Sequence, residues 1–160
     1  MADINYRAML SLSRESLSML RAGGRLEELL ERHYLEIAHF KDIALDIDWE
    51  AYEKCETAGK LRCFAARIEG DLIGYVVYLV NHNPHYKGSL QAVQDVLYMA
   101  PERRGLFAGS RLIAYADRCL AAEGVQAVYH HAKAAYPLDS VLRRNGYELV
   151  DTLWAKRLDR

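Results

Sequence analysis

The chain has 160 residues, of which 51% are hydrophobic or aromatic and 27% are charged. This is the size and composition of one globular domain with its own core, so we expect a single domain spanning residues 1–160, and wholesale disorder is excluded. Twenty-one basic and 22 acidic side chains give a net charge of −1. The balance argues against a nucleic-acid partner, because phosphate binding depends on clustered Lys and Arg.

The sequence also gives expectations about the cellular compartment of the protein and about metal binding. The three cysteines are far apart and fit neither a disulfide framework nor a zinc spacing. The amino terminus lacks the charged and apolar regions of a signal peptide, and the longest apolar run, residues 72–80, is shorter than the ~20 residues that cross a bilayer. We therefore expect a cytoplasmic protein without a membrane partner. The histidines at 82, 85, 130 and 131 lack a convincing metal-ligand spacing, so no metal is expected.

The elements predicted in chain order form a mixed α/β pattern. They are a weak strand at 6–12, helices at 14–21, 25–37 and 48–56, strands at 61–68 and 72–80 joined by a Glu-Gly-Asp turn, a loop at 81–87, a strand at 89–99, a helix at 109–122, a strand at 125–130, a helix at 138–145 and a last strand at 147–157. This order combines an antiparallel meander with one β-α-β crossover. It predicts an α/β (α+β) fold, a mixed and mostly antiparallel central sheet with helices on both faces.

Charge is distributed unevenly along the chain. Residues 1–80 carry 10 basic and 14 acidic groups, and residues 81–160 carry 11 and 8; the stretch 42–56 alone has a net charge of −5. An anion is expected on the C-terminal half and a cation at the acidic stretch. Both regions are equally well explained as solvated faces, and charge counts do not separate these interpretations.

The segment 95–112 carries the strongest chemical signal. A strand is followed by a turn with Arg103, Arg104 and Gly105, and a helix begins at once near Gly109. The free N–H groups and the positive dipole end of such a helix bind anions such as a pyrophosphate, and glycine permits close approach of the backbone. A strand, turn and helix with two glycines is also a common structural arrangement, so this pattern alone leaves both interpretations open.

The same segment resembles the signature of the GNAT superfamily, the acetyl-CoA-dependent N-acetyltransferases. In that family a strand ends in alternating hydrophobic residues and a proline, and Arg/Gln-x-x-Gly-x-Gly/Ala opens the next helix. Leu97, Met99 and Pro101 match the first part; Arg104 and Gly109 match the second. The first glycine of the signature is replaced by a phenylalanine.

The likeness covers residues 25–157 and is greatest to small acetyltransferases of bacteria and their phages. The Arg-Arg-Asn-Gly-Tyr run at 143–147 is similar to the family's x-x-x-Gly-Phe helix end, and the turn at 69–71 is similar to its central hairpin. The resemblance implies a GNAT fold whose central β-α-β crossover binds acetyl-CoA, entering between the strands that end near residues 99 and 130. The residues it assigns to the co-substrate are Leu97, Tyr98, Met99, Arg103, Arg104, Gly105, Leu106, Phe107, Ala108, Gly109 and Ser110.

The resemblance also implies candidates for proton transfer. Asp95 matches a carboxylate that deprotonates the amine in some members, and period-two alternation places it on the strand face of Leu97 and Met99. The family's tyrosine acid falls on Leu142, so Tyr136 is the substitute by proximity. His85, in the loop 81–87, is a second candidate base or a residue that shapes the acceptor pocket.

We therefore expect an acetyltransferase that transfers an acetyl group from acetyl-CoA to an amine of a small molecule or a protein. Phe107 and Leu142, two departures at functional positions, leave open a different class of function: a binding module with weakened catalysis that acts on a protein partner. RNA-linked acetylation is a third, weaker interpretation. The predicted last strand, with Tyr147 and Trp154, leaves pairing across a homodimer open.

Overall fold

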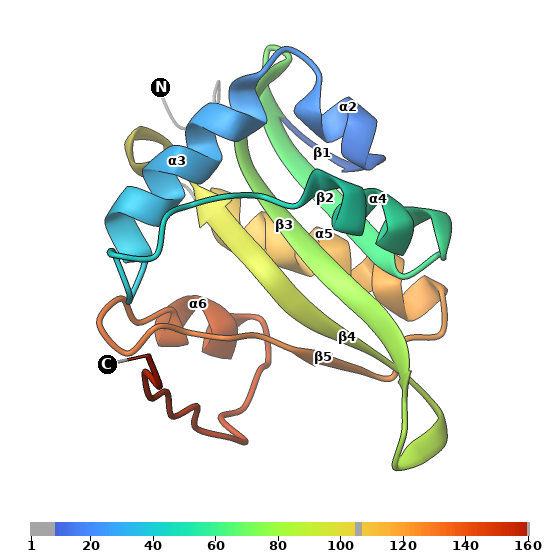
Figure 1. Cartoon of the computed structure of the whole chain (residues 1–160). Helices are drawn as coiled ribbons and strands as arrows, with labels where there is room; N and C mark the ends of the chain where they lie inside the picture. Colours follow the sequence, from blue (N-terminus) through green and yellow to red (C-terminus); the bar gives the residue numbers. More distant parts are fainter. Residues whose placement is uncertain (1–8, 105–106, 160) are drawn as a thin grey trace.

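The computed structural model describes residues 9–104 and 107–159, with one five-stranded sheet at its centre (Figure 1). The strands are β1 (Leu10–Glu15), β2 (Leu61–Ile68), β3 (Asp71–Asn83), β4 (Tyr86–Met99) and β5 (Ala127–Tyr129). The helices are α2 (Leu17–Arg21), α3 (Arg25–Ile37), α4 (Trp49–Thr57), α5 (Ala108–Ala122) and α6 (Asp139–Arg144), with the short 3-10 helix η1 (Pro101–Arg103).

The strands pair in the order in which they follow each other along the chain. β1 to β4 form antiparallel neighbours, whereas β5 runs parallel to β4 from Gln91 opposite Ala127 to Val93 opposite Tyr129. Parallel neighbours need a long crossover, and α5 supplies it. The predicted mixed, mostly antiparallel sheet with one β-α-β crossover is confirmed.

Helices cover both faces of the sheet, as predicted. Figure 1 shows α2, α3 and α4 in front of the sheet and α5 behind it. Successive side chains of a strand point to opposite faces of the sheet. β2 and β3 carry apolar side chains on both faces, so they contribute to two hydrophobic cores. The core on the α5 face is built around Phe64, Ile73, Val76, Tyr78, Leu112, Ala116 and Leu120. The core on the other face is built around Leu17, Leu20, Leu26, Leu29, Leu72, Tyr75 and Tyr98.

Two predicted boundaries were wrong for local reasons. The helix predicted from residue 14 begins at Leu17, because Arg14 and Glu15 still pair with β2 and the hydroxyl of Ser16 accepts the Met19 N–H to cap the helix. The loop predicted at 81–87 is mostly strand: β3 and β4 continue pairing to Asn83 opposite Tyr86, leaving a two-residue turn.

The predicted last strand at 147–157 was also wrong. In the described part of the chain these residues form no ladder with the sheet. The Tyr147 hydroxyl donates to Asp117 at 2.6 Å, and the Arg157 guanidinium pairs with Asp42 at 2.9 Å. These contacts hold residues 147–157 beside α6 (Figure 1). Among the described residues, no helix is both long enough and apolar enough to cross a membrane.

Candidate functional site at the start of α5

The start of α5 presents backbone donors that the helix itself does not use. The first hydrogen bond of α5 runs from the Arg111 N–H to the carbonyl oxygen of Phe107, the residue before the helix, at 2.8 Å. The N–H groups of Ala108, Gly109 and Ser110 precede that bond and have no acceptor within the helix. Together with the helix dipole they form a site for an anion such as a pyrophosphate.

Gly109 leaves room for such a ligand. A Cβ built on this glycine meets nothing within 4 Å, and its φ is ordinary, so neither packing nor backbone conformation requires glycine there. The Ser110 hydroxyl accepts a hydrogen bond from Asn145 at 2.9 Å, which ties the first turn of α5 to α6. Gly105 and Leu106, also predicted for this site, lie outside the described residues.

Phe107 occupies the backbone conformation that normally favours glycine. Its φ is 61° and its ψ is 20°, in the left-handed region that costs a residue with a Cβ about 1–2 kcal/mol. This conformation is the physical reason for a glycine at this place in the predicted signature. The exposed Phe107 ring lies 4.7 Å from the Arg144 guanidinium. The Phe107 ring therefore contacts a residue of α6.

Arg104 supports the turn before α5 through its side chain. Its guanidinium donates to both carboxylate oxygens of Glu36, at 2.5 and 2.7 Å, and its Nε donates to Met99 O at 2.9 Å. The hydrogen bonds from Arg104 hold the pKa of Glu36 below its usual range. The resemblance assigns Arg104 to the co-substrate; in this structure its charge is paired with Glu36 of α3, which fixes η1 beside that helix. The Arg103 side chain is exposed on η1.

An aromatic layer lies beneath this ion pair. The Tyr98 hydroxyl donates to Glu36 at 3.1 Å, and its ring stacks on His33 at 4.8 Å between centroids. His33 shares a 3.1 Å hydrogen bond with the Tyr75 hydroxyl. Burial lowers the pKa of His33 to about 4, so this imidazole is neutral at pH 7. Tyr98 therefore belongs to the face of α3, opposite Leu97 and Met99, which pack on the α5 side.

Asp95 sits in a bulge of β4. Val96 pairs with Val77 and Gln94 pairs with Tyr78, so Asp95 is the extra residue between two consecutive pairs. The bulge breaks period-two alternation and turns the exposed Asp95 to the face of α4, where its carboxylate accepts the Tyr52 hydroxyl at 2.5 Å.

The strand face expected for Asp95 was therefore wrong. Leu97 and Met99 lie on the opposite face of the sheet. The Asp95 side chain is exposed to solvent.

β4 and β5 separate beside this bulge. Their last pair is Val93 with Tyr129, and the Gln94 side chain then accepts the backbone N–H of His131 at 3.2 Å. β4 continues to Met99, whereas β5 has ended. The two strands end at Met99 and Tyr129, close to the ends at residues 99 and 130 between which the resemblance places acetyl-CoA.

The three predicted proton-transfer residues are not assembled around one point. His85 lies at the turn of the β3–β4 hairpin, ten residues before Asp95, which at ~3.3 Å per residue is about 30 Å along the strand. Tyr136 is exposed and forms an isolated bridge with Lys133. Burial is the main cause of the lowered pKa of His33, and the charge of Lys133 adds to it. The bridge between Lys133 and Tyr136 therefore lies near His33 on α3.

Sequence analysis missed two residues that organise the site. Tyr52 holds Asp95, and Glu36 joins Arg104 to Tyr98. Each partner lies more than 40 positions away along the chain. No local spacing in the sequence marks either pairing.

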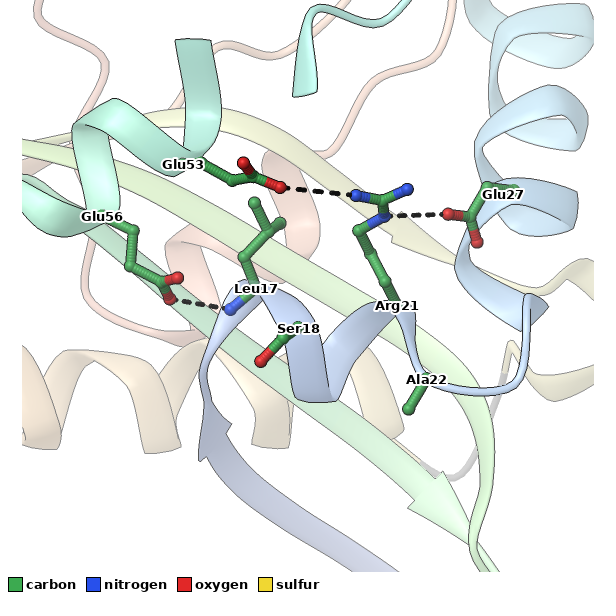
Figure 2. A pocket seen from close by; sticks show the side chains of 7 residues that line it. All are labelled: Leu17, Ser18, Arg21, Ala22, Glu27, Glu53 and Glu56. Atoms are coloured by element: carbon green, nitrogen blue, oxygen red, sulfur yellow. Dashed lines mark hydrogen bonds and ion pairs between the residues drawn. The ribbon is translucent and has the colours of Figure 1, made fainter. Parts of the chain in front are cut away.

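A hollow of about 420 Å³ lies elsewhere, between α2, α3 and α4 (Figure 2). Figure 2 shows Arg21 directed at Glu27 and Glu53, with separations of 3.0 and 3.8 Å, and Glu56 accepting the N–H of Leu17 at 2.7 Å. None of the residues predicted for the site lines the hollow. Within residues 9–104 and 107–159, no group of three or more His, Cys, Asp or Glu is placed to hold a metal.

Several solved structures with the same fold are described as acetyltransferases, and one is described as a transcriptional regulator from Bacillus halodurans. A predicted acetyltransferase from Clostridium acetobutylicum, solved with acetyl-CoA, has a TM-score of 0.70 at 13% identity over 94% of this chain and 97% of that one. Glucosamine-6-phosphate N-acetyltransferase from Arabidopsis thaliana has a TM-score of 0.70 at 12% identity, covering 94% and 99%. An aminoglycoside N-acetyltransferase in complex with CoA has a TM-score of 0.69 at 16% identity, covering 92% and 93%.

At these identities the likeness demonstrates a shared fold and does not transfer a substrate. No curated protein resembles the chain closely enough in sequence to be compared. The sequence profile of the acetyltransferase (GNAT) family matches residues 25–139, which is most of the chain. The profile, the sheet with its parallel β4–β5 pair and the donor-rich start of α5 agree. The chain belongs to the acetyltransferase (GNAT) family.

Proposed function

We propose that the protein transfers an acetyl group from acetyl-CoA to an amine. The observation that carries this proposal is the start of α5, where three N–H groups lack a helical acceptor and Gly109 has open space above it. Two structures with this fold were solved with acetyl-CoA or CoA, which supports the choice of co-substrate. The pyrophosphate would bind residues 108–110, and the pantetheine would lie beside Leu97 and Met99, where β4 leaves β5.

Asp95 is the proposed general base. Its carboxylate is exposed, lies in the bulge beside the point of strand separation, and is oriented by Tyr52. It would take a proton from the amine as the nitrogen attacks the thioester carbonyl. The C–S bond then breaks, and the thiolate leaves with a proton from Tyr136 or from water. We assign His85 no part in this step, because it lies about 30 Å along the strand from Asp95.

The acceptor proposed here is a cationic amine of a small molecule or a protein. Asp95 lies on the same face of the sheet as α4, and the acidic stretch 42–56 spans α4 and the loop before it. Figure 1 shows this loop crossing in front of the sheet from α3 to α4. A negative field on that face raises the local concentration of a cation and lowers that of an anionic acceptor.

Release of the CoA thiol across a panel of amines tests the proposal. We expect wild-type turnover with cationic amines and a 10²–10⁴-fold loss of kcat in Asp95→Asn, the usual effect of removing a general base. Asp46→Asn, which removes an exposed carboxylate from the acidic stretch, is the matched control and keeps kcat.

Equal kcat in Asp95→Asn and wild type would refute the role of Asp95. Acetyl-CoA binding without turnover on any amine would refute catalysis and favour the binding module.

A further inference from the structure

A phenylalanine and an arginine form a pair directly beside the free N–H groups of α5. The Arg144 guanidinium lies over the Phe107 ring, 4.7 Å from its centroid. Phe107 is the residue immediately before α5, and Arg144 is the last residue of α6. A cation is attracted to the negative face of an aromatic ring, so this contact restrains a long and flexible side chain. The guanidinium is thereby held next to the start of α5.

The end of α6 is also fixed on α5 by the residues that follow Arg144. The Asn145 amide donates to the Ser110 hydroxyl at 2.9 Å, and the Tyr147 hydroxyl donates to Asp117 at 2.6 Å. Both acceptors belong to α5, and Ser110 lies in its first turn. The position of Arg144 beside the start of α5 therefore follows from the packing of the two helices and does not depend on the ring contact alone.

Arg144 brings a positive charge that no carboxylate neutralises in the part of the chain that the structure describes. Its side chain is exposed, and among the described residues it forms no ion pair. Arg104 differs, because both of its terminal nitrogens bond to the carboxylate of Glu36. A pyrophosphate carries more negative charge than the roughly +0.5 that the start of a helix offers. A cation beside the free N–H groups therefore strengthens the binding of this anion.

We propose that Arg144 binds the pyrophosphate of acetyl-CoA and that Phe107 positions its guanidinium for this contact. The planar guanidinium presents several N–H donors in a fixed arrangement that suits phosphate oxygens. The inference rests on the proposed function, since it adds a side chain to the backbone donors of residues 108–110. It also gives a role to the ring of Phe107, which stands where the resemblance has glycine: the backbone keeps the left-handed conformation, and the ring holds the cation.

Calorimetry with two co-substrates tests the role of Arg144. They are acetyl-CoA and acetyl-dephospho-CoA, which keeps the pyrophosphate and lacks the 3′-phosphate. We expect Arg144→Gln to raise the Kd of both by about 10-fold, the effect of losing a hydrogen bond to a charged group. The Kd of acetyl-CoA should also depend less on salt in Arg144→Gln than in wild type, because one attraction that salt screens has been removed.

Arg143→Gln is the matched control. It removes the same charge from the neighbouring exposed position of α6, but Arg143 does not lie over the Phe107 ring. This variant should bind both co-substrates within about 2-fold of wild type and keep the salt dependence, since an exposed charge without a direct contact contributes little. Both substitutions are at exposed positions, so we expect unchanged far-UV circular dichroism spectra.

Phe107→Leu tests the positioning role of the ring. Leucine keeps the Cβ and its strain in the left-handed conformation, but it offers no aromatic face to the guanidinium. We expect the Kd of acetyl-CoA to rise about 3-fold in the wild-type background. In the Arg144→Gln background Phe107→Leu should have no further effect, because the two side chains act through one contact.

Three results would overturn the inference while leaving the proposed function intact. Equal Kd values in Arg144→Gln and Arg143→Gln would show that Arg144 makes no specific contact. A loss confined to acetyl-CoA, with acetyl-dephospho-CoA unaffected, would place Arg144 on the 3′-phosphate. Additive effects of Phe107→Leu and Arg144→Gln would exclude positioning by the ring. Absence of acetyl-CoA binding to wild type would overturn the proposed function together with this inference, so the two failures are distinguishable.

Discussion

The left-handed conformation of Phe107 makes a quantitative prediction about stability. In this conformation a Cβ costs about 1–2 kcal/mol, whereas glycine adopts it freely. Glycine also gains about 0.4–1 kcal/mol of freedom in the unfolded chain relative to alanine, which opposes the first effect. Both Phe107→Gly and Phe107→Ala remove the ring contact with Arg144. Their difference therefore isolates the backbone, and Phe107→Gly should be the more stable by about 1 kcal/mol.

Urea denaturation of the two variants measures this difference, which for a chain of this size corresponds to about 2–4 °C in Tm. Arg118 provides the control, because it is exposed in the middle of α5 with an ordinary helical backbone. There alanine should exceed glycine by about 1 kcal/mol. If alanine is at least as stable as glycine at position 107, the positive φ of Phe107 and the account of the signature glycine are refuted.

Three further outcomes are expected. Glu36→Gln removes the charged partner of the guanidinium that fixes η1, and it should weaken acetyl-CoA binding about 10-fold by calorimetry; an unchanged Kd would contradict this. Burial lowers the pKa of His33 to about 4, below its unfolded value of 6.5, so stability is complete above pH 6.5 and falls as the pH drops towards 4. His33→Gln should remove about 2 kcal/mol of the loss in unfolding free energy between pH 7 and pH 5, and an unaltered slope would exclude a buried neutral imidazole. Gly74→Ala places a Cβ 2.6 Å from Met99 Cε and should cost about 1–3 kcal/mol in urea denaturation, whereas Gly88→Ala meets no atom within 4 Å; equal stability of the two would show that β3 is not packed as described.

Local chemistry explains which elements the sequence predicts well. The Glu-Gly-Asp turn defines the β2–β3 hairpin because Glu69 and Gly70 both adopt positive φ, at 51° and 90°. The start of α5 is equally local, since a helix that begins immediately after a strand leaves its own N–H groups free. Apolar periodicity places α3 and α5 correctly. These features depend on residues that are neighbours along the chain.

The features that sequence analysis missed depend on distant partners. The bulge at Asp95 follows from how β4 registers with β3, and it reverses the face that alternation predicts. The pairing of Arg104 with Glu36, 68 positions away, has no local signal in the sequence. Residues 147–157 were predicted as a strand, but in the described part of the chain no strand pairs with them, and a sequence pattern alone does not supply a neighbour.

Binding of acetyl-CoA to Gly109→Trp, compared with Gly88→Trp, tests the central claim most directly. Both glycines have ordinary φ and open space at the Cβ position, but only Gly109 lies at the start of α5. At 100 times its Kd, acetyl-CoA should stabilise wild type and Gly88→Trp by about 2.7 kcal/mol, which raises Tm by about 5–10 °C. Gly109→Trp should melt at the same temperature with and without acetyl-CoA. An undiminished shift in Gly109→Trp, or no shift in wild type, would contradict the assignment of the co-substrate site to the start of α5.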